Sequence, residues 1–218
     1  MKEKEALEKG IELGKLQEEQ KKLAKLVVLK DENDFSQATR FAGMHIEMLG
    51  KEILVSIVVL DEALEVIEEK YVTRPPRFPY IPGYQAYREL PAMLAAFDKL
   101  EEVPDVIFIE STGIAHARGL GLASHFGLTV GKPTIGITKD IFEGEKKDKD
   151  VIMNKKVVAS LLETKKGSNP IYVSPGHMLT LKTALELTKR CIKEPHKMPE
   201  PIVQARKSAS TVQHEMGH

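Results

Sequence analysis

The segment VIFIESTGIAHARGLGLASHFG, Val106–Gly127, carries the clearest fold signal in the chain. Its first four residues, Val106–Ile109, are apolar and largely β-branched, which predicts a buried strand. Glu110 stands where this strand ends, and a glycine-rich loop then leads to a helix expected at Leu120–Thr129. A second strand is expected at Pro133–Lys139, so the segment predicts a βαβ unit with two parallel strands. In open α/β sheets, functional sites gather beyond the carboxyl ends of such strands.

The composition is that of one globular α/β domain. The chain has 218 residues, of which 42% are hydrophobic, and this is enough for a single domain with a sizeable core. Its one cysteine, Cys191, excludes an intrachain disulfide and an all-cysteine zinc site and fits a reducing cytosol, so we expect a cytoplasmic protein. The longest mostly apolar run, Ile53–Leu60, is too short to span a bilayer. We therefore expect no membrane partner and, without an apolar N-terminal segment, no export.

The formal net charge is zero, with 32 basic and 32 acidic side chains, which argues against indiscriminate duplex binding. The charges are nevertheless unevenly distributed. Residues 74–88 contain three arginines and no acid, and residues 111–139 contain Arg118, Lys132 and Lys139 but no acid. This pattern predicts a locally basic face, and ordinary surface scatter of charges remains an equal alternative.

Further elements are expected on both sides of the βαβ unit. Segments Phe41–Met48, Lys51–Leu60 and Leu64–Tyr71 have strand patterns separated by turn residues, which predicts an antiparallel meander. The other expectations are a helix at residues 5–26, a proline-rich loop at Thr73–Gly83, a helix at Leu90–Leu100 with Pro91 in its first turn, a solvated loop at Asp140–Asp150, strands at Lys156–Thr164 and Ile171–Ser174, a helix at Leu179–Lys193, and a polar C-terminal tail at residues 207–218. A meander followed by helix-linked parallel strands matches an α/β fold with an RNase H-like mixed sheet flanked by helices.

Two short motifs resemble a dinucleotide-binding site and a zinc-protease site, but neither has the residues that such a site requires. Gly119–Ala123 reads GLGLA, but no acidic residue follows at the spacing of a dinucleotide-binding motif, so we expect no cofactor nucleotide. The last five residues, HEMGH at His214–His218, satisfy the H-E-x-x-H zinc-protease pattern. Gly217 weakens a helix there and no third ligand follows, so we expect no zinc-protease site.

Five blocks resemble, in order and spacing, those of the endonuclease V family. They are PYIPG (Pro79–Gly83), YRELP (Tyr87–Pro91), GIAHARGLGLASHFG (Gly113–Gly127), KPTIGITK (Lys132–Lys139) and YVSPGH (Tyr172–His177). The resemblance covers about residues 13–206 of an expected single domain, residues 1–218.

The resemblance implies a metal-dependent endonuclease for nucleic-acid repair. It would recognise deaminated adenine, as deoxyinosine in DNA or inosine in single-stranded RNA, and hydrolyse the second phosphodiester on its 3′ side. Carboxylates would hold Mg²⁺ (or Mn²⁺), which activates water and stabilises the negative charge that develops on the phosphate.

The resemblance also implies how the nucleic acid is held. Pro79, Tyr80, Ile81 and Pro82 would form a wedge between strands, with Tyr80 available to stack on a base. A pocket would receive the flipped base. The implied pocket residues are Gly83, Gly121 and, at its mouth, His116, while Lys139 would meet a phosphate.

The metal-binding positions of the family are altered in this chain. Only Glu89 stands as in the family, whereas His45 and Glu110 stand where the family has aspartate, and Arg206 stands where it has histidine or aspartate. Glu110 has one methylene more than aspartate, enough to move a ligand oxygen by about 1 Å. His45 offers a nitrogen ligand that suits Mn²⁺ better than Mg²⁺. Arg206 cannot bind a cation but can bind a phosphate.

The residues therefore leave alternatives open. If the protein cleaves, we expect Glu89, Glu110 and His45 on the metal and Arg206 on a phosphate. The alternatives are a homologue that binds inosine-containing or distorted DNA or RNA without cleaving it, and, less favoured, a structural module. Glu47 shares a strand face with His45, so it either restores a carboxylate to the site or, as is commoner, is a solvated strand-end glutamate.

Overall fold

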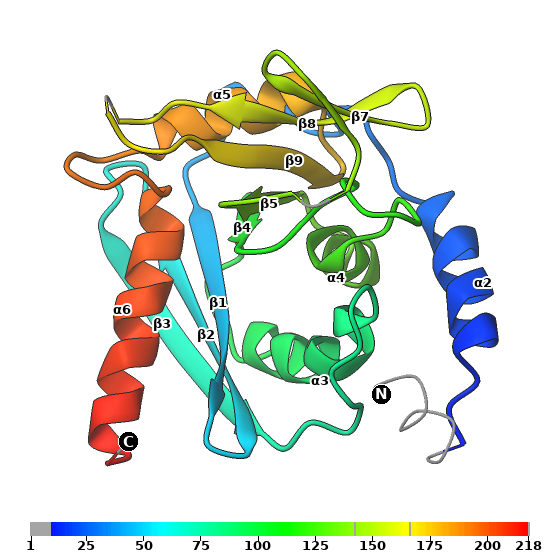
Figure 1. Ribbon diagram of the computed structural model, residues 1–218. Coiled ribbons are helices and arrows are strands. Elements are labelled where there is room, and N and C mark those ends of the chain that lie inside the picture. Colours follow the sequence, from blue (N-terminus) through cyan, green and yellow to red (C-terminus); the bar gives the residue numbers. More distant parts are fainter. Residues whose placement is uncertain (1–9, 142, 166, 218) are drawn as a thin grey trace.

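The computed structural model describes residues 10–141, 143–165 and 167–217, and these residues contain one mixed sheet of nine strands (Figure 1). The strands are β1 (Phe41–Leu49), β2 (Glu52–Leu60), β3 (Val66–Arg74), β4 (Val106–Ile109), β5 (Thr134–Thr138), β6 (Glu145–Lys147), β7 (Asp150–Met153), β8 (Lys156–Leu162) and β9 (Ile171–His177). Their order across the sheet is β3-β2-β1-β4-β5-β9-β8-β7-β6. The short strand β4 therefore lies between β1 and β5.

Helices cover both faces of the sheet and build a core on each. α5 and α6 contribute to the core on one face, and α3 and α4 to the core on the other, while α2 packs beside α4. The helices are α2 (Leu13–Ala24), α3 (Gln85–Phe97), α4 (Leu122–Val130), α5 (Leu181–Arg190) and α6 (Glu200–Glu215). Of the helices in the described residues, none combines the length and the apolar character needed to cross a membrane.

The predicted fold class is confirmed. β1, β2 and β3 form the expected antiparallel meander. β4 and β5 pair in parallel and are connected through α4, as predicted from the βαβ pattern. β1 also pairs with β4 in parallel, and this pairing joins the meander to the βαβ unit.

A close contact at Gly43 fixes α6 on β1. A Cβ atom at Gly43 would lie 2.0 Å from the carbonyl oxygen of Pro201, so only glycine allows the first turn of α6 to approach the strand this closely. His45 lies two residues further along β1 and therefore on the same face. Arg206 lies further along α6 and is carried over that face of β1.

The predicted polar tail at residues 207–218 is wrong. α6 continues to Glu215, and it buries Ser208 and Val212 against the sheet. The buried face of this helix is hard to recognise in the sequence, because small and polar residues occupy many of its positions. Ser208, for example, can be buried at little cost, because its hydroxyl accepts a hydrogen bond from the hydroxyl of Ser56 at 2.7 Å.

Other boundaries also differ from the prediction. The segment Asp140–Asp150 is not only a loop, because it holds β6 and the start of β7, whose lysines and aspartates hide the strand pattern. α3 begins at Gln85, so Pro91 lies inside the helix and not in its first turn. Of the helix predicted at residues 5–26, residues 13–24 form α2, and residues 5–9 lie outside the described residues.

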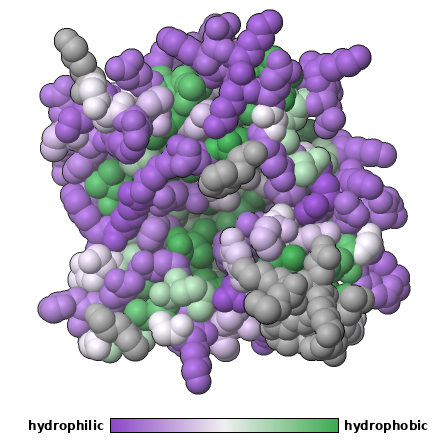
Figure 2. All heavy atoms as spheres, in the orientation of Figure 1, coloured by the Kyte–Doolittle hydropathy of each residue, from purple (hydrophilic) through white to green (hydrophobic). Residues whose placement is uncertain are grey.

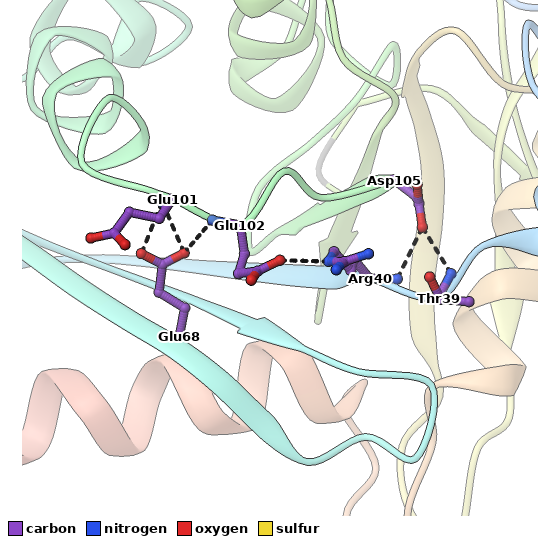
Figure 3. Close-up of polar contacts among 6 residues, drawn as sticks. All are labelled: Thr39, Arg40, Glu68, Glu101, Glu102 and Asp105. Carbon is purple, nitrogen blue, oxygen red and sulfur yellow. Dashed lines mark hydrogen bonds and ion pairs between the residues drawn. The ribbon is translucent and has the colours of Figure 1, made fainter.

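Carboxylates fix the loop ahead of β4 to the sheet (Figure 3). Glu68 on β3 accepts hydrogen bonds from the backbone N–H groups of Glu101 at 3.0 Å and Glu102 at 2.8 Å. Glu102 in turn pairs with Arg40 at 2.7 Å, and Asp105 accepts two backbone N–H groups just ahead of β1. These contacts set where β4 begins relative to β1.

The Glu68 contact predicts an acid-sensitive part of the stability. Burial alone would raise the pKa of Glu68, but the hydrogen bonds from the two N–H groups outweigh it and hold the pKa below the ordinary 4.5. The contact therefore stabilises the protein fully above pH 4.5 and is lost as the pH falls through the lower, folded-state pKa. We expect Glu68→Ala to reduce the free energy of unfolding by about 1–2 kcal/mol at neutral pH.

Urea unfolding of both proteins at neutral and acidic pH measures this. The exposed Glu163, which makes no hydrogen bond or ion pair within the described ranges, provides the control Glu163→Ala. A difference between wild type and Glu68→Ala that stays constant into acid would contradict the assignment.

Candidate functional site

Glu110, His45 and Arg206 come together at the carboxyl end of β4. In the parallel pairing of β1 with β4, Met44 lies opposite Ile109, so the next residues, His45 and Glu110, are neighbours. Glu110 Oε2 lies 3.2 Å from His45 Nδ1 and accepts a hydrogen bond from Arg206 Nε at 2.7 Å. Arg206 Nη2 donates to the other oxygen, Oε1. We call these three residues the Glu110 cluster.

The Glu110 cluster is a charge-assisted, two-point ion pair that solvent can reach. Burial alone would raise the pKa of Glu110, but the hydrogen bonds from His45 and Arg206 and the guanidinium charge outweigh it and lower the pKa to about 2. Pairs of this geometry are the strong kind of salt bridge. The side chains of Glu110 and Arg206 remain 23% and 31% exposed.

Glu47 lies at the edge of the Glu110 cluster. Its Oε2 is 3.7 Å from His45 Nε2, so His45 stands between two carboxylates, as the shared strand face predicts. The side chain of Glu47 is 29% exposed. It is therefore neither buried nor a fully solvated strand-end residue.

Glu89 is separate from the Glu110 cluster. It lies on α3, which covers the face of the sheet opposite α6, and its carboxyl group forms no hydrogen bond or ion pair within the described residues. Burial raises the pKa of Glu89 to about 7, while the charge of Arg88 acts in the other direction. A carboxyl with such a pKa can give or take a proton near neutral pH.

The residues present do not fit the Mg²⁺ or Mn²⁺ that the resemblance implies. Within residues 10–141, 143–165 and 167–217, no group of three or more His, Cys, Asp and Glu side chains is placed to hold a metal ion. Both oxygens of Glu110 accept hydrogen bonds from Arg206, whose charge opposes a second cation. Glu89, predicted as the third ligand, forms no hydrogen bond with Glu110 or His45 and no metal-holding group with them in the described part of the chain.

The terminal HEMGH motif lies only partly within the described residues. His214 and Glu215 lie in the last turn of α6, and His218 lies outside the described residues.

A cavity of ≈ 390 Å³ lies next to the Glu110 cluster. Ser111 and Thr112, which directly follow Glu110, form part of its wall, and the proline-rich loop forms another part. Of the predicted wedge residues, Tyr80 is 47% exposed and lines the cavity with Pro82. The loop predicted as the wedge thus presents an exposed aromatic side chain beside a pocket that is large enough for a small ligand.

The other predicted wedge residues are placed differently. Ile81 is only 4% exposed and anchors the loop in the interior, and Pro79 is half-buried. The predicted wedge therefore reduces to Tyr80 and Pro82.

The carbonyl oxygen of Gly83 connects the proline-rich loop, which we call the wedge loop, to α2 and to the glycine-rich loop before α4. It accepts hydrogen bonds from Gln20 Nε2 at 3.0 Å and from Arg118 Nη2, and it lies 3.2 Å from His116 Nε2. Arg118 Nε also donates to Gln20 Oε1 at 2.6 Å, and its guanidinium lies over the ring of Tyr84. We call this set the Gly83 latch. Because its carbonyl is fully used, Gly83 has only its N–H to offer to a ligand.

His116 is a neutral member of the Gly83 latch. Burial lowers the pKa of His116, and the charge of Arg118 lowers it further. Its Nδ1 accepts the backbone N–H of Arg118 at 3.2 Å, which leaves the ring proton on Nε2, facing Gly83. His116 lines the cavity, and through Gly83 it also supports the proline-rich loop that forms another part of the wall.

Two predicted binding residues lie outside the cavity wall. The N–H of Gly121 donates to Gly113, its carbonyl accepts from His125, and a Cβ atom there would lie 2.3 Å from Thr112 Oγ1. Gly121 therefore allows close packing of the loop and does not face a ligand. Lys139 is exposed just after β5, beside Thr138, which does line the cavity.

Gln20 is the main residue that sequence reasoning missed. Its side chain is 1% exposed, and it connects α2 to both the wedge loop and Arg118. A signal was present, because Gln20 occupies the buried position between Leu16 and Leu23 in the apolar pattern of the helix. A polar side chain at such a position indicates a specific hydrogen-bond partner.

The three arginines of residues 74–88 lie together in the wall of a second cavity, of ≈ 260 Å³. Arg74, Arg77 and Arg88 line it, and none of them forms an ion pair with a carboxylate among the described residues. The face of the molecule seen in Figure 2 is largely hydrophilic, with hydrophobic side chains gathered near its hollowed centre. Arg88 donates hydrogen bonds to the carbonyl oxygen of Phe78 at 2.9 Å and to the sulfur of Met48 at 3.1 Å.

The comparisons with known proteins agree on one family. The sequence profile described as Endonuclease V matches residues 21–207. Endonuclease V of Kosmotoga olearia is 38% identical over 174 residues, which cover 75% of this chain and 76% of that protein.

Solved structures show the same fold. The endonuclease V structure from Streptomyces avermitilis is 29% identical, covers 94% of both chains and has a TM-score of 0.86. The endonuclease V structure from Ciona intestinalis, in complex with a 24mer DNA containing an inosine followed by a ribo-adenosine, is 24% identical with a TM-score of 0.85 and covers 94% of this chain and 98% of that one.

The Gly83 latch predicts a stability loss when Gln20 is replaced. Gln20→Leu leaves Arg118 Nε without its acceptor and removes one donor from Gly83, so we expect the free energy of unfolding to fall by about 1–3 kcal/mol. Gln17→Leu, on the same helix, breaks no hydrogen bond in the described part of the chain and is the matched control. Equal stability of the two variants in urea unfolding would show that the latch contributes nothing.

Burial of Glu89 predicts a characteristic pH profile. The folded-state pKa of about 7 exceeds the ordinary 4.5, so the folded protein binds the extra proton, and stability falls as the pH rises from 4.5 to about 7. Glu89→Gln removes this titration. We expect the variant to be more stable than wild type by roughly 1–3 kcal/mol at pH 8 and little changed below pH 4.5. Parallel pH profiles of the two proteins in urea unfolding would contradict the raised pKa.

Proposed function

This chain belongs to the endonuclease V family, and on that basis we propose that it is an endonuclease acting on inosine in DNA or single-stranded RNA. The observation that carries the proposal is the cavity of ≈ 390 Å³ whose wall includes the exposed Tyr80 and the two residues after Glu110. The relative from Ciona intestinalis that binds inosine-containing DNA has the same fold, which supports inosine as the ligand. A cytoplasmic location, expected from the single cysteine, is part of the same proposal.

The proposed recognition step places a flipped base in the cavity. An enzyme that acts beside a base takes it out of the stack, and an aromatic side chain fills or supports the gap. Tyr80 has the exposure for this task, and the Gly83 latch keeps its loop in place. The hydroxyl of Thr138 is buried in the wall and has no hydrogen-bond partner among the described residues, so it is available to the polar edge of a base.

The proposed chemical step is hydrolysis of the second phosphodiester 3′ to the inosine, leaving a 3′-hydroxyl and a 5′-phosphate. Glu89 is the proposed acceptor of the proton from the attacking water, because its pKa of about 7 suits general base catalysis. As the water oxygen bonds to phosphorus, the bond between phosphorus and the 3′ oxygen breaks, and that oxygen takes a proton from solvent. Arg206 and Lys139 are the proposed contacts to phosphate oxygens. Involvement of Mg²⁺ or Mn²⁺ stays a prediction of the resemblance, and the Glu110 cluster does not support it.

One observation favours a second function, binding of inosine-containing or distorted nucleic acid without cleavage. The pairing of Glu110 with Arg206 uses the carboxylate that hydrolysis by a metal ion would require. Recognition through the cavity and the arginines does not depend on that carboxylate. The known relatives are endonucleases, so the comparisons do not favour this alternative.

A cleavage assay distinguishes the two functions. Single-stranded and duplex oligonucleotides with one inosine, and matched ones with adenine, are incubated with the protein in EDTA, Mg²⁺ and Mn²⁺. The proposal predicts a cut one nucleotide 3′ of the inosine that is lost in Glu89→Gln and kept in the surface control Glu163→Gln. Inosine-selective binding without a cut under any condition would reject the nuclease and establish the second function.

A further inference from the structure

We infer that Arg206 is a built-in cation that takes the place of a metal ion, so that the Glu110 cluster binds a backbone phosphate of nucleic acid without any divalent metal. The inference rests on the proposed function only for the identity of the ligand as nucleic acid. It concerns a position at which the resemblance implies histidine or aspartate and this chain has arginine.

Arg206 has unused donors that point to a ligand. A guanidinium carries five N–H donors, and Glu110 accepts one from Nε and one from Nη2. The other three have no hydrogen-bond partner among the described residues, although the side chain is only 31% exposed. Glu110 therefore holds the guanidinium in a fixed orientation, with three donors left for the oxygens of a phosphate.

Arg206 and a divalent metal ion exclude each other at this position. A metal ion would have to bind the oxygens of Glu110, and both already accept hydrogen bonds from the guanidinium. Displacing Arg206 would leave two like charges close together in a partly buried site. Within the described residues, no third His, Cys, Asp or Glu side chain joins Glu110 and His45 in a group that could hold a metal ion.

The location of the Glu110 cluster matches a phosphate of the strand whose base enters the cavity. Ser111 and Thr112 line the cavity and follow Glu110 directly in the chain. A nucleotide whose base lies against these residues carries its backbone past the end of β4. Without Arg206, the negative charge of Glu110 would repel that backbone, and the guanidinium charge cancels this repulsion.

Binding measurements in EDTA test the phosphate contact. The probe is a fluorescein-labelled single-stranded oligonucleotide with one inosine, followed by anisotropy, and the adenine version is measured in parallel. We expect the same Kd in EDTA and in Mg²⁺, and a Kd roughly ten- to a hundredfold higher for Arg206→Gln. The slope of log Kd against log salt should fall by about one. The control Lys207→Gln removes the same charge from the next, exposed residue of α6 and should leave both values near wild type.

A double variant guards against misfolding. Arg206→Gln leaves Glu110 unpaired, whereas Glu110→Gln with Arg206→Gln removes both charges and leaves none buried alone. The double variant should fold and bind more weakly than wild type, because it lacks the donors of Arg206, but less weakly than the single variant, because it also lacks the repelling carboxylate of Glu110. Wild-type affinity in the double variant would overturn the inference and leave the ion pair as a purely structural contact between α6 and β4.

Metal binding is measured without nucleic acid. Titration calorimetry with Mn²⁺ should show no saturable binding at the Glu110 cluster in wild type. Arg206→His removes the guanidinium and adds an imidazole to Glu110 and His45, which makes three ligands, so this variant should bind Mn²⁺. Saturable Mn²⁺ binding by wild type that Glu110→Gln abolishes would overturn the inference.

The outcomes separate this inference from the proposed function. Binding that depends on Arg206 but does not prefer inosine over adenine would reject the proposed function and leave the inference standing. Binding that prefers inosine but requires Mg²⁺, or that is unchanged in Arg206→Gln, would reject the inference and leave the proposed function standing.

Discussion

The site depends on the close packing of α6 against β1 at Gly43. Because residue 43 has no side chain, the backbone of Pro201 can lie directly on the strand, where a Cβ atom would come within 2.0 Å of its carbonyl oxygen. The helix then carries Arg206 over the neighbouring ends of β1 and β4, where His45 and Glu110 stand side by side. A larger residue at position 43 would lift the helix and separate the guanidinium from the carboxylate, even though none of the three cluster residues would have changed.

The two halves of the site are built on opposite faces of the sheet. The Glu110 cluster takes its cation from α6 on one face, while the cavity takes part of its wall from α2 and α3 on the other side. Glu110 and the two residues after it connect the halves, since the first belongs to the cluster and the next two to the cavity wall. The Gly83 latch keeps the wedge loop at a fixed distance from this connection. A nucleic-acid strand bound there would therefore meet a prearranged surface.

The sequence predicts the scaffold well because strand alternation and glycine-rich turns are local signals. The meander, the βαβ unit and the position of Glu110 after a buried strand all follow from such signals. The pairing of Glu110 with Arg206 joins residues 96 positions apart, and it exists only because α6 packs on β1. That helix is hard to foresee, since Ala205, Ser208 and Ala209 bury a stripe that looks polar or featureless in the sequence. Gln20 illustrates the same limit, because a polar residue at an apolar position indicates a partner without identifying Gly83 and Arg118.

The chain therefore combines the fold of the endonuclease V family with a centre whose positive charge comes from the protein. The most direct test is a crystal structure of the complex with an inosine-containing single-stranded oligonucleotide, grown in Mn²⁺, with anomalous data collected to locate the metal. The account predicts that the guanidinium of Arg206 lies between Glu110 and a backbone phosphate, with no anomalous peak at Glu110. A manganese peak on the carboxylate of Glu110, with Arg206 turned away, would contradict it.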